Sequence, residues 1–295
     1  MIRKSSRCVL ALVVFALALP ASAPAQRMES QSAWDSVGRV LQTAPAPSTG
    51  YVRFNFPRRD IVLKVRDVTV APALALGAWF GFSGTPAASL VMGDLVLLGD
   101  ELGPALDELN KQGIGVTAIH NHVVGEPQVT FVHVHAEGPA VDLARKLDRV
   151  LARTRTPRPV AAATPAPVTI DTALVNRTLG AQGRAAGAVS QFSMVLPTVP
   201  ITMHGKTVVP GQAYATPVNV QMVDASRYVA TGDFSVLEGR VQPVLSALAS
   251  HGITATALHS HMIGETPKIY YIHFWADGAP AAVLAGLRAA IDAGR

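Results

Sequence analysis

The chain has 295 residues, of which 49% are hydrophobic and 15% are charged. This length fits two domains of ordinary size, and the composition excludes a globally disordered chain because enough apolar surface is present to build cores. The formal net charge of +5 arises without any long run of lysine or arginine, so we expect no nucleic-acid partner.

The first 25 residues have the pattern of a secretory signal peptide. Three basic residues precede an apolar run from Cys8 to Leu19, and small residues up to Ala25 follow it. This order is typical of a leader that is cleaved after export, and we place the cleavage after Ala25. The sequence therefore predicts residues 1–25 as a signal peptide and the mature chain as a periplasmic or secreted protein without a stable membrane anchor. Cys8 is the single cysteine, so the mature chain is expected to form no disulfide.

The rest of the chain contains one sequence unit twice. The segment VTAIHNHVVGE, which begins at Val116, returns as ATALHSHMIGE from Ala255, 139 positions later. This period is too long for a solenoid repeat and indicates a duplicated domain. We predict repeat domains at residues 32–153 and 169–295, joined by a Pro/Ala-rich linker at residues 154–168.

Each repeat shows the same order of predicted elements. In the first repeat the expected strands are, in chain order, residues 51–56, 61–66, 75–82, 89–97, 115–121 and 129–136. The expected helices are residues 34–41, 100–112 and 139–151, with counterparts at 172–179, 236–250 and 279–291. Asp100 is the expected N-cap of its helix, and Gly113 is the expected left-handed stop. This order predicts an α+β fold: two tandem antiparallel-sheet units with helices on one face, related to the ferredoxin-like fold.

Seven of the nine histidines fall into two short windows, one in each repeat. The first window contains four of them and the second contains three: His120, His122, His133 and His135, then His259, His261 and His273. Residues two apart on a strand point to the same face, so both histidines of each His-x-His pair are expected to project together. If His120 lies opposite His133 across the hairpin, their imidazoles are close enough to share one ligand.

Each hairpin therefore predicts a site that can hold a transition metal. The turns add Glu126 and Glu265, so that the predicted ligands are His120, His122, Glu126 and His133, and His259, His261, Glu265 and His273. Three imidazoles and one carboxylate suit Zn, Cu, Ni or Fe. His135 is not predicted as a ligand, because Trp275 occupies the equivalent position in the second repeat.

Three further residues are candidates for a supporting role. Asp94 and Asp233 each follow a glycine, and each either orients a ligand histidine or bonds to the local backbone. Tyr270 is a candidate to offer its hydroxyl to the site. His204 and His251 have no counterpart in the other repeat, and we expect both at the surface.

These sequence strings resemble the LppY/LpqO family of bacterial exported proteins. The resemblance covers nearly all of the mature chain and rests on Gly93-Asp94, on residues 118–122 with Gly125-Glu126, and on residues 257–262 with 273–276. It implies a duplicated, exported protein and no particular reaction, because that family is functionally uncharacterised. Its name-giving members look like lipoproteins, and this chain departs from them in lacking a cysteine after the leader.

Three functions remain open on this pattern. A metal-dependent enzyme outside the cytoplasm would use Glu126 or Glu265 as a general base. A periplasmic binding or sensor protein would hold a metal or a small polar ligand without turnover. A structural module would use the histidines in an interface between the repeats, which are expected to pack on each other. The sequence does not choose between one composite site and two separate sites.

Overall fold

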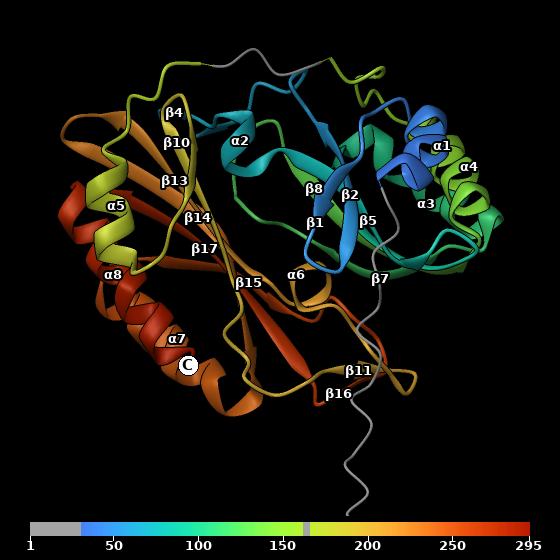
Figure 1. Ribbon diagram of the computed structural model, residues 1–295. Coiled ribbons are helices and arrows are strands. Elements are labelled where there is room, and N and C mark those ends of the chain that lie inside the picture. Colours follow the sequence, from blue (N-terminus) through green and yellow to red (C-terminus); the bar gives the residue numbers. More distant parts are fainter. Residues whose placement is uncertain (1–30, 162–165) are drawn as a thin grey trace, which may run out of the picture.

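A computed structural model describes residues 31–161 and 166–295, so the predicted signal peptide lies outside the described residues. Two six-stranded antiparallel sheets face each other, and helices cover the outer face of each sheet (Figure 1). One sheet with its helices comes from each repeat. The prediction of an α+β fold with two tandem antiparallel-sheet units and helices on one face is therefore confirmed.

The first repeat builds a sheet with the strand order β1-β2-β5-β6-β8-β7. Its strands are β1 (Ala46–Ser48), β2 (Tyr51–Pro57), β5 (Gly77–Thr85), β6 (Ala88–Leu98), β7 (Gly115–His120) and β8 (Val129–Gly138). Its helices are α1 (Gln31–Leu41), α3 (Gly99–Gln112) and α4 (Ala140–Leu151). Strand β8 lies between β6 and β7, which makes β6-α3-β7 a split β-α-β unit, the motif of the ferredoxin-like fold.

The second repeat repeats this plan with the strand order β15-β17-β14-β13-β10-β9. Its strands are β9 (Arg184–Ala186), β10 (Val189–Met194), β13 (Thr216–Asp224), β14 (Arg227–Leu237), β15 (Thr254–His259) and β17 (Ile269–Gly278). Its helices are α5 (Thr172–Leu179), α7 (Glu238–Ser250) and α8 (Pro280–Ala293). None of the described helices is long and apolar enough to cross a membrane.

Two local predictions are wrong. The helix cap is made by Glu101 rather than Asp100, because the Glu101 carboxylate accepts a hydrogen bond from the Leu98 backbone N–H at 2.8 Å. Gly113 does end the helix in a left-handed conformation, with a φ of 65°. The strand expected at residues 61–66 is reduced to β3 (Lys64–Val65), which pairs with β4 (Val68–Thr69). Its alternation reflects burial of every second side chain against the core, not pairing in the sheet.

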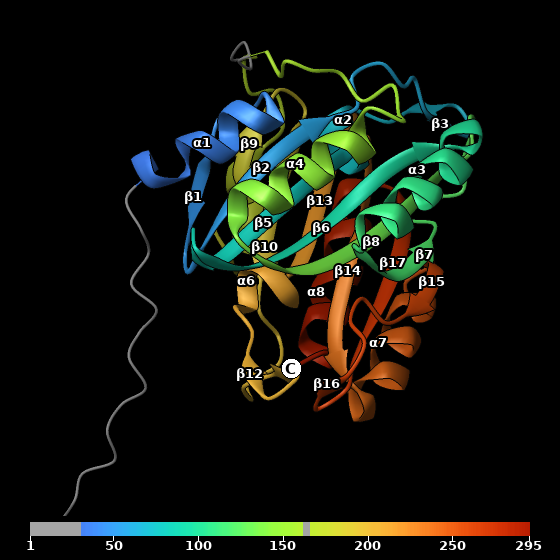
Figure 2. The same ribbon diagram turned by 90° about the vertical axis from the view of Figure 1, so that its right-hand side faces the viewer.

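Each repeat sends a short helix across to the sheet of the other. Helix α2 (Pro72–Ala75) lies on the second sheet, where the Asn219 side-chain N–H donates to the Leu74 carbonyl at 2.8 Å. Helix α6 (Pro210–Ala213) lies on the first sheet, where the Gln212 side-chain N–H donates to the Gly81 carbonyl at 2.7 Å (Figure 2). The two repeats therefore make equivalent contacts with each other's sheets, as expected for an interface with approximate twofold symmetry.

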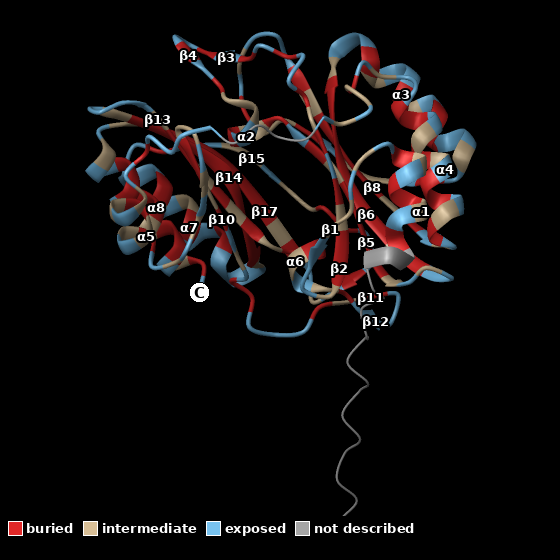
Figure 3. Cartoon of the chain, turned by 45° about the horizontal axis from the view of Figure 1, so that its top comes forward, coloured by how far each residue is buried: buried red, intermediate tan, exposed pale blue. Residues whose placement is uncertain are grey.

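The described residues form three apolar cores. Two of them lie between a sheet and its helices. The third lies between the repeats and includes the buried side chains of Met92, Met203, Tyr214, Met262 and Tyr271. Strands at the centre of both sheets are buried on their facing sides (Figure 3). Polar side chains that point between the sheets are thus withdrawn from water.

Candidate metal centre between the repeats

A β-bulge turns His120 of β7 toward the other repeat. Gly115 lies opposite His135, but after a register shift between Val116 and Ala118, Ala118 lies opposite His133. The shift by one residue exchanges the two faces of a strand, so the end of β7 presents His120 to the space between the sheets. The second repeat has the same shift, between Ala255 and Ala257.

The bulge also changes the predicted pairing of His120. Its direct partner on β8 is Phe131, so His120 does not lie opposite His133, the arrangement considered from the sequence. His133 is the diagonal neighbour, and its ring centroid lies 4.9 Å from that of His120. The equivalent His259 lies opposite Tyr271, again with the histidine of the neighbouring strand, His273, on the diagonal.

Six histidines from the two repeats form one central cluster: His120, His122, His133, His259, His261 and His273. Each histidine of one repeat lies against one of the other. The ring centroids of His120 and His259 are 4.1 Å apart. The His133–His261 and His122–His273 centroids are 3.7 and 3.8 Å apart.

The His133–His261 and His122–His273 contacts are equivalent in the two repeats, because His133 corresponds to His273 and His122 to His261. The approximate twofold axis therefore passes between His120 and His259, which correspond to each other. The structure brings all six predicted histidine ligands into one composite site at the interface.

Many polar atoms of this cluster are buried and without a hydrogen-bond partner among the described residues. Both ring nitrogens of His120 are in this state, as are Nε2 of His133, Nδ1 of His259 and Nε2 of His261. One carboxylate oxygen of Asp94 is also buried without a hydrogen bond. Such atoms are rare in folded proteins and costly, so a concentration of them at one place is typical of a ligand-binding site.

The two predicted supporting aspartates lie beside the cluster. Asp233 Oδ1 is 2.6 Å from His273 Nδ1 and 3.4 Å from His122 Nδ1. Asp94 Oδ2 is 3.8 Å from His122 Nε2 and 4.0 Å from His133 Nε2. Gly93, which precedes Asp94, allows the close approach of β5, since a Cβ atom there would lie 2.4 Å from the Trp79 carbonyl oxygen. Both carboxylates are placed to orient imidazole rings.

Burial keeps the imidazoles neutral. Withdrawal from water, reinforced by neighbouring histidines, lowers the pKa of His122 and of His259 to about 3. The pKa of His133 falls to about 4, mainly through burial, which the charge of Asp94 offsets in part. The pKa values of His120 and His261 are lowered further by the same causes. Because a metal binds the neutral ring, these side chains are ready ligands at neutral pH.

The aspartates respond differently to the same surroundings. Burial raises the pKa of Asp94 to about 6, against a smaller opposing effect of His133. Burial also acts to raise the pKa of Asp233, but His273 and His122 outweigh it and lower the value to about 2. Asp233 is therefore the firmly ionised carboxylate of the site.

Several groups of these side chains have the donor set of a metal site. One ring nitrogen from each of His120, His133, His259 and His261 lies within 4.8 Å of the others. Two further groups meet the same limit of 4.8 Å. One consists of His120, His122 and His273, and the other of Asp233, His261 and His273. Imidazole and carboxylate ligands fit Zn, Cu, Ni or Fe(II).

The two glutamates predicted as ligands or bases are not in any of these groups. Glu126 is exposed, and its backbone pairs with Lys64. Glu265 is buried, but its Oε1 accepts a hydrogen bond from Ser260 at 3.0 Å and contacts the Lys268 amine at 3.0 Å. The structure thus places both glutamates outside the histidine cluster.

Tyr271, and not Tyr270, is the tyrosine of the site. The ring of Tyr271 stacks on His261 with 3.5 Å between centroids, and its hydroxyl donates to the Ala213 carbonyl at 2.8 Å. Tyr270 packs with the core beneath the helices of the second repeat. Strand alternation contained this signal, because Tyr271 is two residues from His273 and therefore on the same face.

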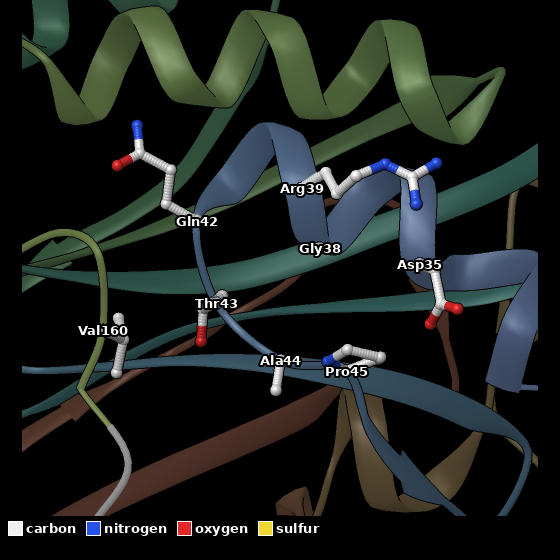
Figure 4. Close-up of a pocket in the computed structure, with 8 residues that line it drawn as sticks. All are labelled: Asp35, Gly38, Arg39, Gln42, Thr43, Ala44, Pro45 and Val160. Atoms are coloured by element: carbon white, nitrogen blue, oxygen red, sulfur yellow. The ribbon is translucent and has the colours of Figure 1, made fainter.

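Two cavities bear on what can reach the site. A cavity of about 30 Å³ touches His133 and His261 and is also lined by Trp79, Met92 and Gln212. A larger depression of about 440 Å³ lies beside α1, where Asp35, Arg39 and Val160 line it (Figure 4). No histidine lines this depression. Of these two cavities, the small one adjoins the candidate centre.

Comparisons with known proteins agree with the duplication. A family model described as Domain of Unknown Function (DUF1259) matches residues 35–153 and again residues 173–293. No curated protein matches the chain. Among solved structures, EtuB from Clostridium kluyveri is 14% identical over 84% of this chain and 89% of its own, with a TM-score of 0.20. A score this low carries no argument. The resemblance to the LppY/LpqO family stays a prediction, since the description of the matching model names neither protein.

Proposed function

We propose that this chain, which belongs to the DUF1259 family and carries its domain twice, is a metal-binding protein whose single composite centre lies between the two repeats. His120, His133, His259 and His261 are the proposed ligands, with His122, His273 and Asp233 close enough to contribute. The observation that carries this proposal is the set of buried ring nitrogens without hydrogen-bond partners, above all both nitrogens of His120.

The alternative of a purely structural histidine network has less support. A structural network gains stability when its buried donors and acceptors bond to each other. Here the described cluster has one hydrogen bond between rings, His273 Nε2 to His259 Nε2 at 3.3 Å. A bound cation would engage one nitrogen of each ligand ring and make the burial of these nitrogens favourable.

Burial of the centre favours binding, storage or transfer of a metal over reaction with a large substrate. The exposed fractions of His120, His133, His261 and His273 are 9%, 8%, 9% and 0%. The neighbouring cavity of about 30 Å³ has the volume of one water molecule in the liquid. Glu126 and Glu265, the candidate general bases, lie outside the ligand groups. We further propose that the protein is exported and works in the periplasm or outside the cell, in keeping with its leader pattern.

Metal analysis of the mature chain, purified without a histidine tag, tests the proposal. We expect at least one equivalent of a transition metal per chain, and loss of the equivalent held at the centre in His120→Ala, because His120 belongs to two of the ligand groups. His251→Ala is the matched control, since His251 is exposed and bonds to the Ala247 carbonyl outside the centre. An unchanged metal content in His120→Ala would rule the centre out.

A second candidate is a metal centre that reacts with a very small molecule. The cavity that touches His133 and His261 supports it, because a ligand of one or two heavy atoms can occupy that volume. Cyanide should then change the visible spectrum of the cobalt-loaded protein, whereas free imidazole, which is too large for the cavity, should not. Equal responses to both, or no response to cyanide, would argue against this second function.

A further inference from the structure

Three metal-ligating side chains meet at the rim of the interface, outside the central cluster. His135 and Glu137 come from β8 of the first repeat, and His204 comes from the turn between β11 (Thr202–Met203) and β12 (Lys206–Thr207) of the second. One ligand atom from each lies within 4.8 Å of the other two. We refer to His135, Glu137 and His204 as the rim cluster.

The position of the rim cluster follows from alternation along β8. His133, His135 and Glu137 are two residues apart, so all three project to the same side of the strand. His133 contributes to the buried central cluster, while His135 is partly exposed and Glu137 is exposed. The strand therefore carries metal-ligating side chains from the buried centre to the solvent.

The equivalent position in the second repeat shows that the fold does not require these residue types. There, Trp275 and Asp277 replace His135 and Glu137, and an ion pair joins the repeats. Arg227 donates to Asp277 at 2.7 Å and to Asp67, in the turn that corresponds to that of His204, at 2.6 Å. A salt bridge closes one rim, whereas two imidazoles and a carboxylate lie at the other.

One atom of the rim cluster lacks a partner in the way that the central histidines do. His135 Nε2 is buried and has no hydrogen-bond partner among the described residues. Its ring centroid lies 5.9 Å from that of His204.

We propose that the rim cluster is a second, solvent-accessible site for a borderline divalent cation such as Zn²⁺, Ni²⁺ or Cu²⁺, and that the bound ion ties the two repeats together. Two imidazoles and one carboxylate are a ligand set that these ions accept, with a fourth position left to water. This site goes beyond the proposed central centre and does not depend on it.

Closing the site needs only small movements of exposed side chains. Ligands about 2.1 Å from a tetrahedral zinc ion are roughly 3.4 Å apart. The rim ligand atoms now lie within 4.8 Å of one another, so they have to approach by at most about 1.4 Å. The Lys206 amine now lies 2.6 Å from Glu137 Oε2. The Lys206 side chain is 71% exposed, so it can swing into solvent when a cation takes its place, at little cost.

The test counts zinc ions bound by the full mature chain, by calorimetry and by metal analysis at a fixed free zinc concentration. Wild type should bind one equivalent more than His204→Ala and than His135→Trp, which installs the residue type of the second repeat. Removing a ligand should weaken this site by more than the roughly 10–100-fold that loss of a supporting residue costs. Lys206→Met should strengthen zinc binding, because the competing ammonium group is gone.

Two controls separate this site from the central one and from nonspecific surface binding. His120→Ala should still bind one zinc ion at the rim cluster. The number of zinc ions bound at the rim can therefore be measured even if the central proposal fails. His251→Ala removes an exposed histidine elsewhere and should lose nothing. The rim site is overturned if His204→Ala binds as much zinc as wild type, or if His251→Ala loses an equal amount.

Discussion

Two buried polar clusters in this protein differ in whether their polar atoms have hydrogen-bond partners. Beside the start of α3, the Arg58 side chain is 0% exposed, and its guanidinium donates to Asp60 and to Glu101, at 2.8 Å to each. Glu101 in turn accepts from the backbone N–H groups of Leu98 and Arg155. Four of the six central histidines are likewise buried, yet many ring nitrogens of their cluster have no partner among the described residues.

This difference separates a structural cluster from a ligand site. The Arg58 cluster satisfies its own charges and therefore holds the fold together without help. The histidine cluster leaves buried nitrogens unsatisfied, which is unfavourable unless something binds there. Substitution of Arg58 should therefore lower the stability of the fold. Substitution of His120 should remove the metal and largely keep the fold.

Acid should give the largest effect and should act mainly through the histidine cluster. A histidine whose pKa is lowered on folding binds fewer protons in the folded state than in the unfolded state, between the two pKa values. Its contribution to stability is therefore complete above about pH 6.5 and is lost as the pH falls toward the folded value. Five central histidines have pKa values lowered in this way, so the free energy of unfolding should fall steeply as the pH drops below about 6.5.

The aspartates modify this expectation without reversing it. Asp94, with a raised pKa of about 6, offsets the effect of one histidine between pH 6 and its unfolded value of 3.8. Asp233, with a lowered pKa, adds a loss only below about pH 3.8. Urea unfolding of the chelator-treated protein at pH 7, 6 and 5 measures the slope. Equal stability at pH 7 and pH 5 would contradict the neutral, buried state of the rings.

Arg58→Met should destabilise the fold more than any single substitution in the histidine cluster. It leaves the Glu101 carboxylate beside α3 without its buried cation, with only the half-exposed Arg155 guanidinium still 3.5 Å away, and loss of one partner of a buried ion pair costs about 3–5 kcal/mol. Denaturant unfolding measures the loss. The metal content of the folded variant should stay that of wild type, because Arg58 is not part of the interface. A fall in metal content at full stability would reverse the assigned roles of the two clusters.

Tyr271→Phe should have the smallest effect of the set. The substitution removes a buried hydroxyl and leaves the Ala213 carbonyl without its donor, which costs about 1–2 kcal/mol. The ring that stacks on His261 remains, so metal binding should persist. Tyr270→Phe is the matched control, because Tyr270 lies on the helix side of the same strand. Equal losses in the two variants would show that the interface hydroxyl has no special contribution.

Local sequence patterns were sufficient for much of the fold and for the membership of the histidine cluster. Helix α5 has the predicted bounds, Thr172–Leu179, because an N-cap Asp171 and a C-terminal Gly180 mark both ends. The strands of the two hairpins and the duplication also follow from alternation and internal repetition. Apolar burial misled the prediction at residues 61–66, where side chains alternate without strand pairing.

Register and docking were decided only by the tertiary structure. A one-residue bulge near Val116 sets which face of β7 carries His120, and nothing in the local pattern marks it. The contact of His120 with His259 joins residues 139 positions apart, and it depends on how two whole sheets pack. The sequence by itself determined which residues are metal-ligating and that each repeat carries a set of them. Only the packing of the two sheets decided that these sets form one buried site. The burial of the ring nitrogens and their lack of hydrogen-bond partners both arise when the interface between the repeats is assembled.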